Sequence, residues 1–341
     1  MKVIAPVMEA QLIETALLNI LNHQSLIATK ASRVVYAAKG DGIMEFGLRR
    51  AQGAGGSLWA SRAAVVGGCA STSNVLAGKL YDIPVSGTHS HSWVMSFDSE
   101  LEAFRAYAKC FPTNCVLLVD TYNVKKGIEN AITVGLEMRE RGEKLAGIRI
   151  DSGDLAWLSR YARERLDAAG LTDCGIVLSN DLDEYTIESI ASRARTYELG
   201  RGTKLATAYD QPALGGVYKL SATKSQGDSK WKARLKVSEM SSKLTLPGVL
   251  DVRRFFFEDG RIAGDMVFDV NEPVKCRKTR SSIRPTCFAR NRLRALRARR
   301  CFARFRVMAN RCSPPKTVAL WPRRRVRKKL LESLTNLRNA C

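Results

Sequence analysis

Arginine, acidic, histidine and glycine residues follow a series of short apolar segments, and these residue types suit the binding of phosphates and sugar hydroxyls. They are Arg49, Arg50, Thr88, His91, Asp120, Arg149, Asp151, Asp154, Asn180, Asp181, Gly200, Arg201, Gly202 and Thr203. Guanidinium groups pair bidentately with phosphates and carboxylates, and the free N–H groups of a GxGT turn can hold a phosphate. The acids of DSGD can bind ribose hydroxyls or share a magnesium ion with a polyphosphate. Together these residues predict a site for a phosphorylated sugar.

Several of these residues also have a simpler structural interpretation. A GxG sequence is commonly only a turn. His89 and His91 form an HxH pattern that could bind a metal or lie on the surface, and without a third nearby ligand the metal is the weakest choice. Asp154 could cap the helix that follows it, and Arg49 and Arg50 could be solvated or ion-paired. The functional interpretation is favoured because the ends of several separate segments all carry residues that suit the same kind of ligand.

The segments that carry these residues alternate short apolar strands with amphipathic helices. The expected strands are MEFGL, IPVSG, VLLVD, GIRID, GIVLS and TYELG. The polar positions after them recur about every thirty residues, the length of one strand, turn and helix, which predicts parallel strands joined by helices. In a barrel of such units the strand ends meet at one mouth. We therefore predict an α/β protein, an irregular (β/α) barrel of parallel strands with a smaller β-rich flanking domain.

The same patterns predict how the chain is divided. We expect a helical segment over residues 1–40, broken once near His23 to Ser25, because apolar residues recur there on one side of a helix. The barrel is expected over 41–216, a β-rich flank with hairpin signals over 217–273, and a basic tail over 274–341. The helix after GIRIDSGD has Leu155, Leu158, Ala162 and Leu166 on one face and is followed by Gly170, a helix-ending residue.

The positive charge of the chain lies almost entirely in this tail. The whole chain has a formal net charge of +22, of which residues 275–341 carry +21 and the preceding residues only +1. One interpretation is translation in the wrong frame, because the tail has no sustained helix or strand period. The other is a nucleic-acid-binding arm, with a cluster of Arg and Lys over 323–329 near Trp321. In either case we expect a disordered tail.

The rest of the composition is that of a soluble cytoplasmic protein. The sequence has no long uncharged apolar run and no signal-peptide pattern near its first residue. Cys69, Cys110, Cys115 and Cys174 lie outside the tail and suit reduced, buried thiols. The absence of paired CxxC spacing argues against a structural zinc site.

A series of motifs closely resembles the nicotinate phosphoribosyltransferase family. They are EFGLRRAQG, GGCASTSNVLAGKL, PVSGTHSHSWVMSF, LLVDTYN, GIRIDSGDL, VLSNDLDE, GRGTKLATAYDQPALGGVYKL and KVSEMSSKLTLPG. They follow the family's order over about residues 5–273. The resemblance implies that nicotinate displaces pyrophosphate from phosphoribosyl pyrophosphate to give nicotinate mononucleotide, in NAD biosynthesis. It further implies coupled ATP hydrolysis through a transient phosphohistidine, a requirement for Mg²⁺, and a homodimer.

Matching motif by motif, the resemblance also implies roles for single residues. His91, in register with Gly87 and Thr88 in the GTxxH motif, is the implied phosphohistidine, and imidazole is a competent phosphoryl acceptor near neutral pH. Arg149 is implied in catalysis together with His91 and Asp151, which is also the implied magnesium ligand. The implied substrate-binding residues are Arg49, Arg50, Thr88, Asp120, Ser179, Asn180, Gly200, Gly202 and Thr203. Within this set, Arg149 and Arg49 are candidates for the nicotinate carboxylate and the pyrophosphate, and Gly200, Gly202 and Thr203 for the 5′-phosphate.

Two departures from the family pattern leave other functions open. Family members begin with a further LTDLYQLTM-like segment whose tyrosine reaches the neighbouring subunit's site, and we expect this chain to lack it. The match also stops after Pro273. The alternatives are a related phosphoribosyltransferase acting on nicotinamide or quinolinate, and an inactive fragment whose basic tail binds polyanions.

Overall fold

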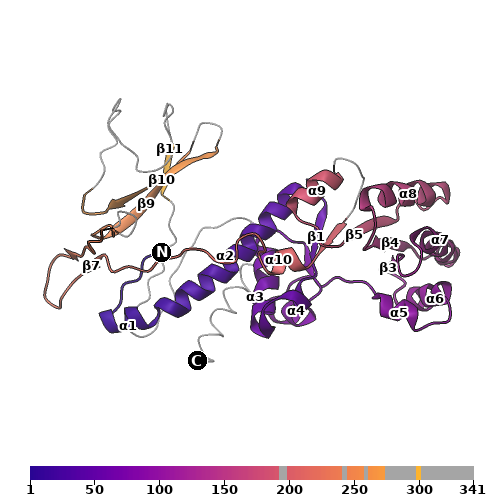
Figure 1. The fold of residues 1–341 in the computed structure, drawn as a ribbon, viewed down its shortest axis with the longest axis horizontal. Coiled ribbons are helices and arrows are strands. Elements are labelled where there is room, and N and C mark those ends of the chain that lie inside the picture. Colours follow the sequence, from indigo (N-terminus) through magenta and orange to yellow (C-terminus); the bar gives the residue numbers. More distant parts are fainter. Residues whose placement is uncertain (192–197, 240–243, 257–259, 273–296, 301–341) are drawn as a thin grey trace. The chain divides into compact units, whose positions relative to one another are not determined.

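The computed structural model describes residues 1–191, 198–239, 244–256, 260–272 and 297–300, and Figure 1 shows their helices and strands. The chain divides into two compact units. The first, which we call the sheet unit, contains Asn19–Gly215 among the described residues. The second, which we call the flanking unit, contains Met1–Leu18 and the described residues between Gly216 and Arg300. None of the described helices combines the length and apolar character that a membrane span requires.

The sheet unit is built on six parallel strands. They are β1 (Gly42–Glu45), β2 (Ser71–Thr72), β3 (Cys115–Leu118), β4 (Leu145–Ile150), β5 (Gly175–Ser179) and β6 (Glu198–Arg201). Their order is β2-β1-β6-β5-β4-β3, so the first strand pairs with the last and the order is that of a barrel open between β2 and β3. The sheet is a curled half-barrel, and the predicted α/β fold with parallel strands is confirmed.

The predicted strand IPVSG is wrong in its extent. Only Val85 pairs, in an isolated parallel bridge to Thr72 of β2. Pro84 has no N–H to donate, so the pairing reduces to Thr72 N–H donating to Pro84 O at 3.0 Å and Ser86 N–H donating to Thr72 O at 3.1 Å. The segment nevertheless lies beside β2, at the opening of the half-barrel. The two-residue strand β2 itself was not predicted from the sequence.

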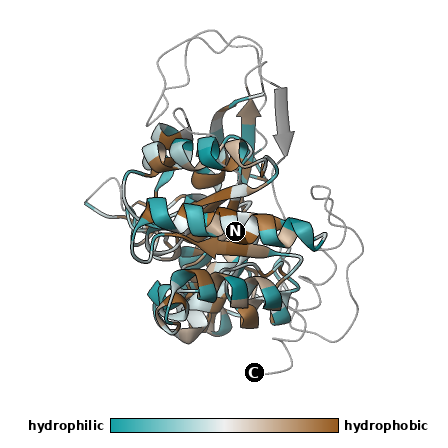
Figure 2. Cartoon of the chain, turned by 90° about the vertical axis from the view of Figure 1, so that its right-hand side faces the viewer, coloured by the Kyte–Doolittle hydropathy of each residue, from teal (hydrophilic) through white to brown (hydrophobic). Residues whose placement is uncertain are grey.

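Helices connect the strands of the sheet unit. They are η1, a 3₁₀ turn (Leu48–Arg50), α3 (Gly53–Val66), α4 (Val75–Tyr81), α5 (His91–Met95), α6 (Glu100–Cys110), α7 (Val124–Glu140), α8 (Leu155–Ala168), α9 (Glu184–Ala191) and α10 (Thr203–Ala206). In Figure 2 the strands between the helices are mostly apolar, whereas the helices carry both polar and apolar residues. The longer helices, such as α6, α7 and α8, therefore bury one face and expose the other.

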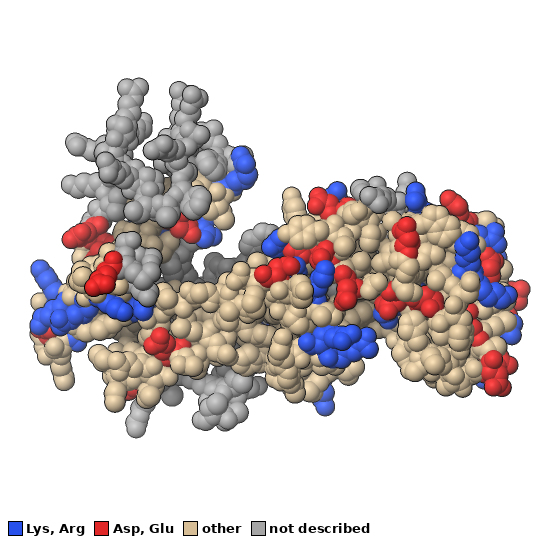
Figure 3. Space-filling model, viewed as in Figure 1, with Lys and Arg blue, Asp and Glu red and all other residues tan. Residues whose placement is uncertain are grey.

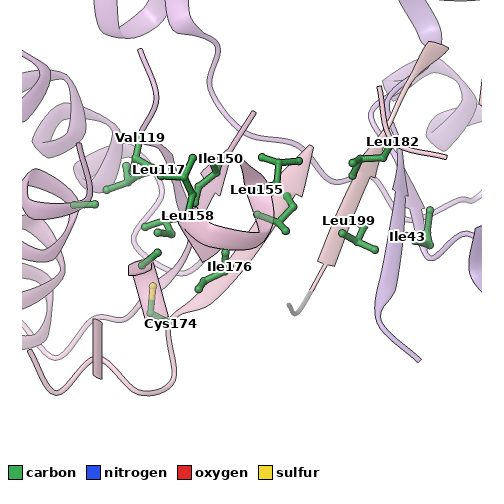
Figure 4. Packing of buried hydrophobic residues seen from close by; sticks show 14 of the residues in the cluster. Ile43, Leu117, Val119, Ile150, Leu155, Leu158, Cys174, Ile176, Leu182 and Leu199 are labelled. Atoms are coloured by element: carbon green, nitrogen blue, oxygen red, sulfur yellow. The ribbon is translucent and has the colours of Figure 1, made fainter. Parts of the chain in front are cut away.

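Helix α8 follows the pattern expected from its sequence. All four predicted apolar positions are buried, with Ala162 and Leu166 fully so. Asp154 caps its first turn by accepting from the N–H groups of Ala156 and Trp157, each at 3.1 Å. Figure 4 shows Leu155 and Leu158 of this helix among buried side chains from β3, β4 and β5. The structural interpretation of Asp154 as a helix cap is thus confirmed.

The first helices differ from the prediction. α1 (Val7–Leu12) and α2 (Glu14–Ala37) meet at Ile13, and α2 continues without a break through His23 to Ser25. That stretch contains neither Gly nor Pro, so nothing interrupts the backbone hydrogen bonds there. Burial of α2 begins directly after it, at Leu26, because only the second half of the helix packs in the core of the sheet unit.

The flanking unit contains short antiparallel sheets. β9 (Leu250–Phe256) pairs with β10 (Ile262–Asp269) and β11 (Arg297–Arg300), and β7 (Ala222–Thr223) pairs with β8 (Lys232–Ala233). The β-rich character expected of the flank is therefore present. Apart from Arg297–Arg300, residues 273–341 lie outside the described residues, and the disorder and nucleic-acid binding considered for the tail stay predictions.

Close packing of α7 on β3 leads to a first prediction. A Cβ added at Gly127 would lie 2.0 Å from the carbonyl oxygen of Val119, so the helix must move to accept any side chain. We expect Gly127→Ala to lower the free energy of unfolding by about 1–3 kcal/mol. In contrast, an added Cβ at Gly56 in α3 meets no atom within 4 Å, and Gly56→Ala is expected to stabilise the protein by up to about 1 kcal/mol. Urea unfolding followed by circular dichroism measures both, and equal effects would contradict the packing argument.

Candidate active site

Arg149, at the end of β4, lies at the centre of a hydrogen-bonded group of side chains. Its Nε donates to Ser179 Oγ at 2.7 Å, its Nη1 to Thr88 Oγ1 at 2.9 Å and its Nη2 to Asp151 Oδ1 at 2.7 Å. Ser179 Oγ also donates to Asp151 Oδ1 at 2.5 Å. These contacts hold the guanidinium plane in one orientation. They leave one N–H on each Nη for an anionic ligand.

Two glycine-containing turns pack closely beside Arg149. The guanidinium carbon lies 5.2 Å from the centre of the Phe46 ring, a cation–π distance. A Cβ at Gly200 would lie 2.7 Å from that ring, and one at Gly47 would lie 2.3 Å from Ala206 Cβ and 2.9 Å from Gly202 O. The turn after β1 can therefore approach β6 and the turn after it only because glycine occupies these positions. Thr203, the first residue of α10, directly follows this contact.

His91, the first residue of α5, faces two carboxylates across the mouth of the half-barrel. Its Nδ1 lies 3.2 Å from Thr121 Oγ1, and its Nε2 lies 4.0 Å from both Asp120 Oδ1 and Asp151 Oδ2. The imidazole is 42% exposed, so a substrate can reach it. Asp151 lies near His91 and also accepts from Arg149, so the nucleophilic ring nitrogen is close to the hydrogen-bonded group around Arg149.

Asp120 has one carboxylate oxygen that accepts no hydrogen bond. Its Oδ2 accepts from Asp151 N–H at 3.1 Å and from Ser152 Oγ at 2.5 Å, whereas its buried Oδ1 has no hydrogen bond. A buried unpaired carboxylate oxygen is unfavourable unless a cation or donor approaches it. Together with Asp151 Oδ2 it fits Mg²⁺, which proteins bind through one or two carboxylates while water and phosphate complete its shell. No cluster of three or more His, Cys, Asp or Glu ligands occurs among the described residues.

Glu45, the last residue of β1, supports the site and was missed by the sequence analysis. It is 1% exposed, and its Oε2 accepts from Ser61 Oγ at 2.9 Å and from Thr72 Oγ1 at 2.6 Å. Its Oε1 accepts from the N–H of Gly47. The carboxylate thereby joins β1, β2 and α3 next to the turn that carries Arg49. The signal for this role was an acid inside the apolar segment MEFGL.

Other predicted residues lie at the same sheet edge but outside this group. Arg49 and Arg50 are exposed in η1, directly after β1, and make no ion pair with the other described residues. Asn180 is exposed after β5, and its Oδ1 accepts from Asp181 N–H at 2.7 Å. The structure therefore gathers Thr88, His91, Asp120, Arg149, Asp151 and Ser179. It leaves Arg49, Arg50 and Asn180 exposed.

Lys204 in the GRGTK motif is committed to an ion pair. Its Nζ donates to Asp183 Oδ2 at 2.6 Å, and Asp183 Oδ1 accepts from Thr186 N–H at 2.8 Å. Burial opposes ionisation of Asp183, but these hydrogen bonds outweigh it and hold the pKa of that carboxyl well below its usual range. The pair ties α10 to the start of α9. It leaves backbone groups, rather than this lysine, for any phosphate at the turn.

His89 is neither a metal ligand nor a surface residue, so both interpretations of it from the sequence were wrong. It is 7% exposed, and its Nε2 accepts from the backbone N–H of Leu118 at 3.0 Å. Burial lowers the pKa of His89 to about 4, which keeps the imidazole neutral.

On the visible face of the sheet unit Lys and Arg are interspersed with Asp and Glu, as Figure 3 shows.

Comparison with known proteins gives this geometry a family. Residues 42–241 match the model of the nicotinate phosphoribosyltransferase (NAPRTase) family. The chain is 48% identical to a Bacillus subtilis nicotinate phosphoribosyltransferase over 281 residues, covering 82% of this chain and 56% of that protein. It is 34% identical to the human nicotinate phosphoribosyltransferase over 330 residues, covering 80% of this chain and 60% of the relative. The chain thus spans somewhat more than half the length of these relatives.

Solved structures agree with the sequence comparison. The crystal structure of human nicotinic acid phosphoribosyltransferase superimposes with a TM-score of 0.67 at 32% identity, covering 80% of this chain and 61% of the other. The nicotinate-nucleotide pyrophosphorylase from Pyrococcus furiosus shares the fold, at 24% identity and a TM-score of 0.58, covering 76% of this chain and 62% of the other. The family match extends over more than half of the chain, and both sequence and structure agree with it. The chain belongs to the nicotinate phosphoribosyltransferase family.

Proposed function

We propose that this chain carries the phosphoribosyl-transfer site of a cytoplasmic nicotinate phosphoribosyltransferase. The pyridine nitrogen of nicotinate attacks the anomeric carbon of phosphoribosyl pyrophosphate, and the bond from that carbon to the pyrophosphate oxygen breaks. Pyrophosphate leaves with the bonding electrons, and nicotinate mononucleotide is formed. The observation that carries the proposal is the position of Arg149, held by Thr88, Ser179 and Asp151 with two N–H donors unused.

Both substrates are anions, and the arginines suit them. The fixed guanidinium of Arg149 binds one anionic group, either the nicotinate carboxylate or the pyrophosphate, through its remaining N–H pair. Arg49 and Arg50, exposed at the same sheet edge, bind the other. The turn of Gly200, Gly202 and Thr203 accepts the 5′-phosphate at its backbone N–H groups. Fixed positive charge near the leaving pyrophosphate lowers the activation free energy for its departure.

Asp151 faces the sugar in this arrangement. Its Oδ1 is engaged by Arg149 and Ser179, and its Oδ2 points toward His91 with the side chain 34% exposed. A transition state of oxocarbenium character places positive charge on the ribose, which a nearby carboxylate stabilises. Holding the pyridine nitrogen over the anomeric carbon supplies the rest of the acceleration through orientation.

We further propose that ATP phosphorylates His91. A bond forms from the γ-phosphorus to the imidazole nitrogen, the bond to the β–γ bridging oxygen breaks, and ADP leaves; water later cleaves the P–N bond to give phosphate. With Nδ1 protonated and donating to Thr121 Oγ1, Nε2 offers its lone pair to the phosphorus. Asp120 and Asp151 would hold Mg²⁺, which when bound offsets the repulsion between their charges and an incoming phosphate.

A turnover assay with three pyridines tests the substrate assignment. Nicotinate, nicotinamide and quinolinate are each supplied with phosphoribosyl pyrophosphate and Mg²⁺, with and without ATP. We expect nicotinate to be converted fastest and ATP to be hydrolysed in the presence of both substrates. Preference for either other pyridine would overturn the proposed substrate, and no conversion of any would favour the inactive fragment. Sedimentation of the same preparation tests the homodimer implied by the family resemblance.

A further inference from the structure

The side chain of His89 occupies the place of a neighbouring strand at the free edge of β3. β3 is the last strand in the sheet order. Val119 N–H, just after it, donates to Arg149 O of β4 at 3.0 Å. Successive N–H groups along a strand point to opposite sides, so Leu118 N–H points away from β4. On that side it donates to His89 Nε2 at 3.0 Å.

The surroundings of His89 select the one imidazole form that can accept this bond. Its Nδ1 lies 3.4 Å from Ser90 O, so a proton on Nδ1 leaves the lone pair on Nε2 for Leu118. The ring packs edge-on against Tyr107, with centroids 4.7 Å apart and an interplanar angle of 71°, and lies 5.9 Å from Phe104. Both aromatic residues belong to α6. The apolar packing excludes water that could replace the imidazole as acceptor.

Three side chains attach the loop before α5 to three different parts of the site. Thr88 accepts from Arg149, His89 accepts from Leu118, and His91 contacts Thr121. Of these three side chains, that of His89 joins the loop to the backbone of a strand. We propose that His89 anchors this loop to β3 and thereby positions His91, an inference that rests on the proposed phosphorylation of His91.

The anchor depends on His89 staying neutral. Protonated Nε2 would present an N–H to the N–H of Leu118, and the hydrogen bond would be lost. The charged or titratable groups around the ring are Arg149 of β4, His91 of α5 and Tyr107 of α6. Because the folded-state pKa of about 4 lies below the ordinary value of 6.5, the stabilisation is complete above pH 6.5 and is lost as the pH falls through 4. Acid therefore releases the loop.

Two variants separate anchoring from simple packing. His89→Gln keeps an acceptor, Oε1, and does not titrate, whereas His89→Leu fills a similar volume without an acceptor. Amide hydrogen exchange of Leu118 and of residues 87–91 measures the anchor directly. The rate at which ATP carrying a radioactive γ-phosphate labels His91 reports how well the imidazole of His91 is positioned for phosphorylation. We expect the Leu variant to exchange about tenfold faster at Leu118 and to be labelled about ten- to a hundredfold more slowly, with the Gln variant near wild type.

The pH dependence provides a second measurement that does not rely on the Leu variant folding. Exchange at Leu118 in the wild type is expected to accelerate, relative to the Gln variant, as the pH falls from 6.5 to 4. Equal exchange in both proteins across this range, or normal exchange in a folded Leu variant, would overturn the anchor. Faster exchange with unchanged labelling would overturn the positioning of His91. Absence of labelling in the wild type would instead refute the phosphorylation, while the exchange comparison still decides the anchor.

Discussion

Replacing Arg149 by methionine is expected to lower kcat/KM for phosphoribosyl transfer by about 10²–10³-fold, the effect of losing one preorganised charged donor. The loss has two sources. The substrate anion loses its guanidinium partner, and Asp151 loses the cation that holds its Oδ1 at 2.7 Å. Arg149→Lys should restore little, because one ammonium group cannot reach Thr88, Ser179 and Asp151 in the plane that the guanidinium spans. Steady-state kinetics with each substrate varied in turn measures the effect.

A second partly buried arginine provides the matched control. Arg163 of α8 is 19% exposed, close to the 17% of Arg149, and it donates to the carbonyl oxygens of Cys174 and Leu171 at 2.7 and 2.9 Å. Arg163→Met removes a comparable number of hydrogen bonds away from the mouth of the half-barrel. It should lower the melting temperature and leave kcat/KM per folded molecule close to wild type. An equal kinetic loss in both variants would mean that Arg149 matters only for folding.

The His91→Ala variant should lose ATP hydrolysis by at least about 10³-fold, as expected for removal of a nucleophile, while slow phosphoribosyl transfer without ATP persists. The reason is that Arg149, Ser179 and the glycine turns stay in place when the imidazole is removed, since none of them contacts it. ATP hydrolysis and nicotinate mononucleotide formation are measured in the same reaction. The ratio of ATP consumed to product formed then reports the coupling directly.

His23 is a suitable control because it is the remaining histidine of the chain and lies outside the site. Its Nε2 contacts Gly56 O at 3.2 Å, between α2 and α3. His23→Ala should hydrolyse ATP at the wild-type rate. If His91→Ala also retained full ATP hydrolysis, the phosphohistidine would be excluded and the carboxylates beside it would need another role.

Local patterns predicted much of the fold because they depend on neighbours in sequence. The apolar face of α8 and the fully buried strand β5 match the expected periodicities. The failures were also local in origin. Pro84 limited a predicted strand to one bridge, and a helix break expected near His23 did not occur because no residue there disrupts the backbone.

The sequence predicted which residues gather at the candidate site but only partly which of them contact one another. The spacing of polar residues after parallel strands placed Thr88, His91, Asp120, Arg149 and Asp151 at one edge, and the structure brings these five together. The spacing could not show which of them touch. Nor could it separate Arg149, which is partly buried in a hydrogen-bonded network, from Arg49 and Arg50, which the same reasoning treated as equivalents and which are exposed.

The strand–helix alternation, the sheet edge where the polar candidates gather and the family could all be predicted from the sequence, because each is encoded in residue type and spacing along the chain. The tertiary structure alone decided that His89 accepts from Leu118 and that Glu45 accepts from Thr72. These pairs lie 29 and 27 residues apart, and a hydrogen bond forms only within about 3 Å. Partners at such separations are set by how strands and loops pack in space, which no local pattern of residues can specify.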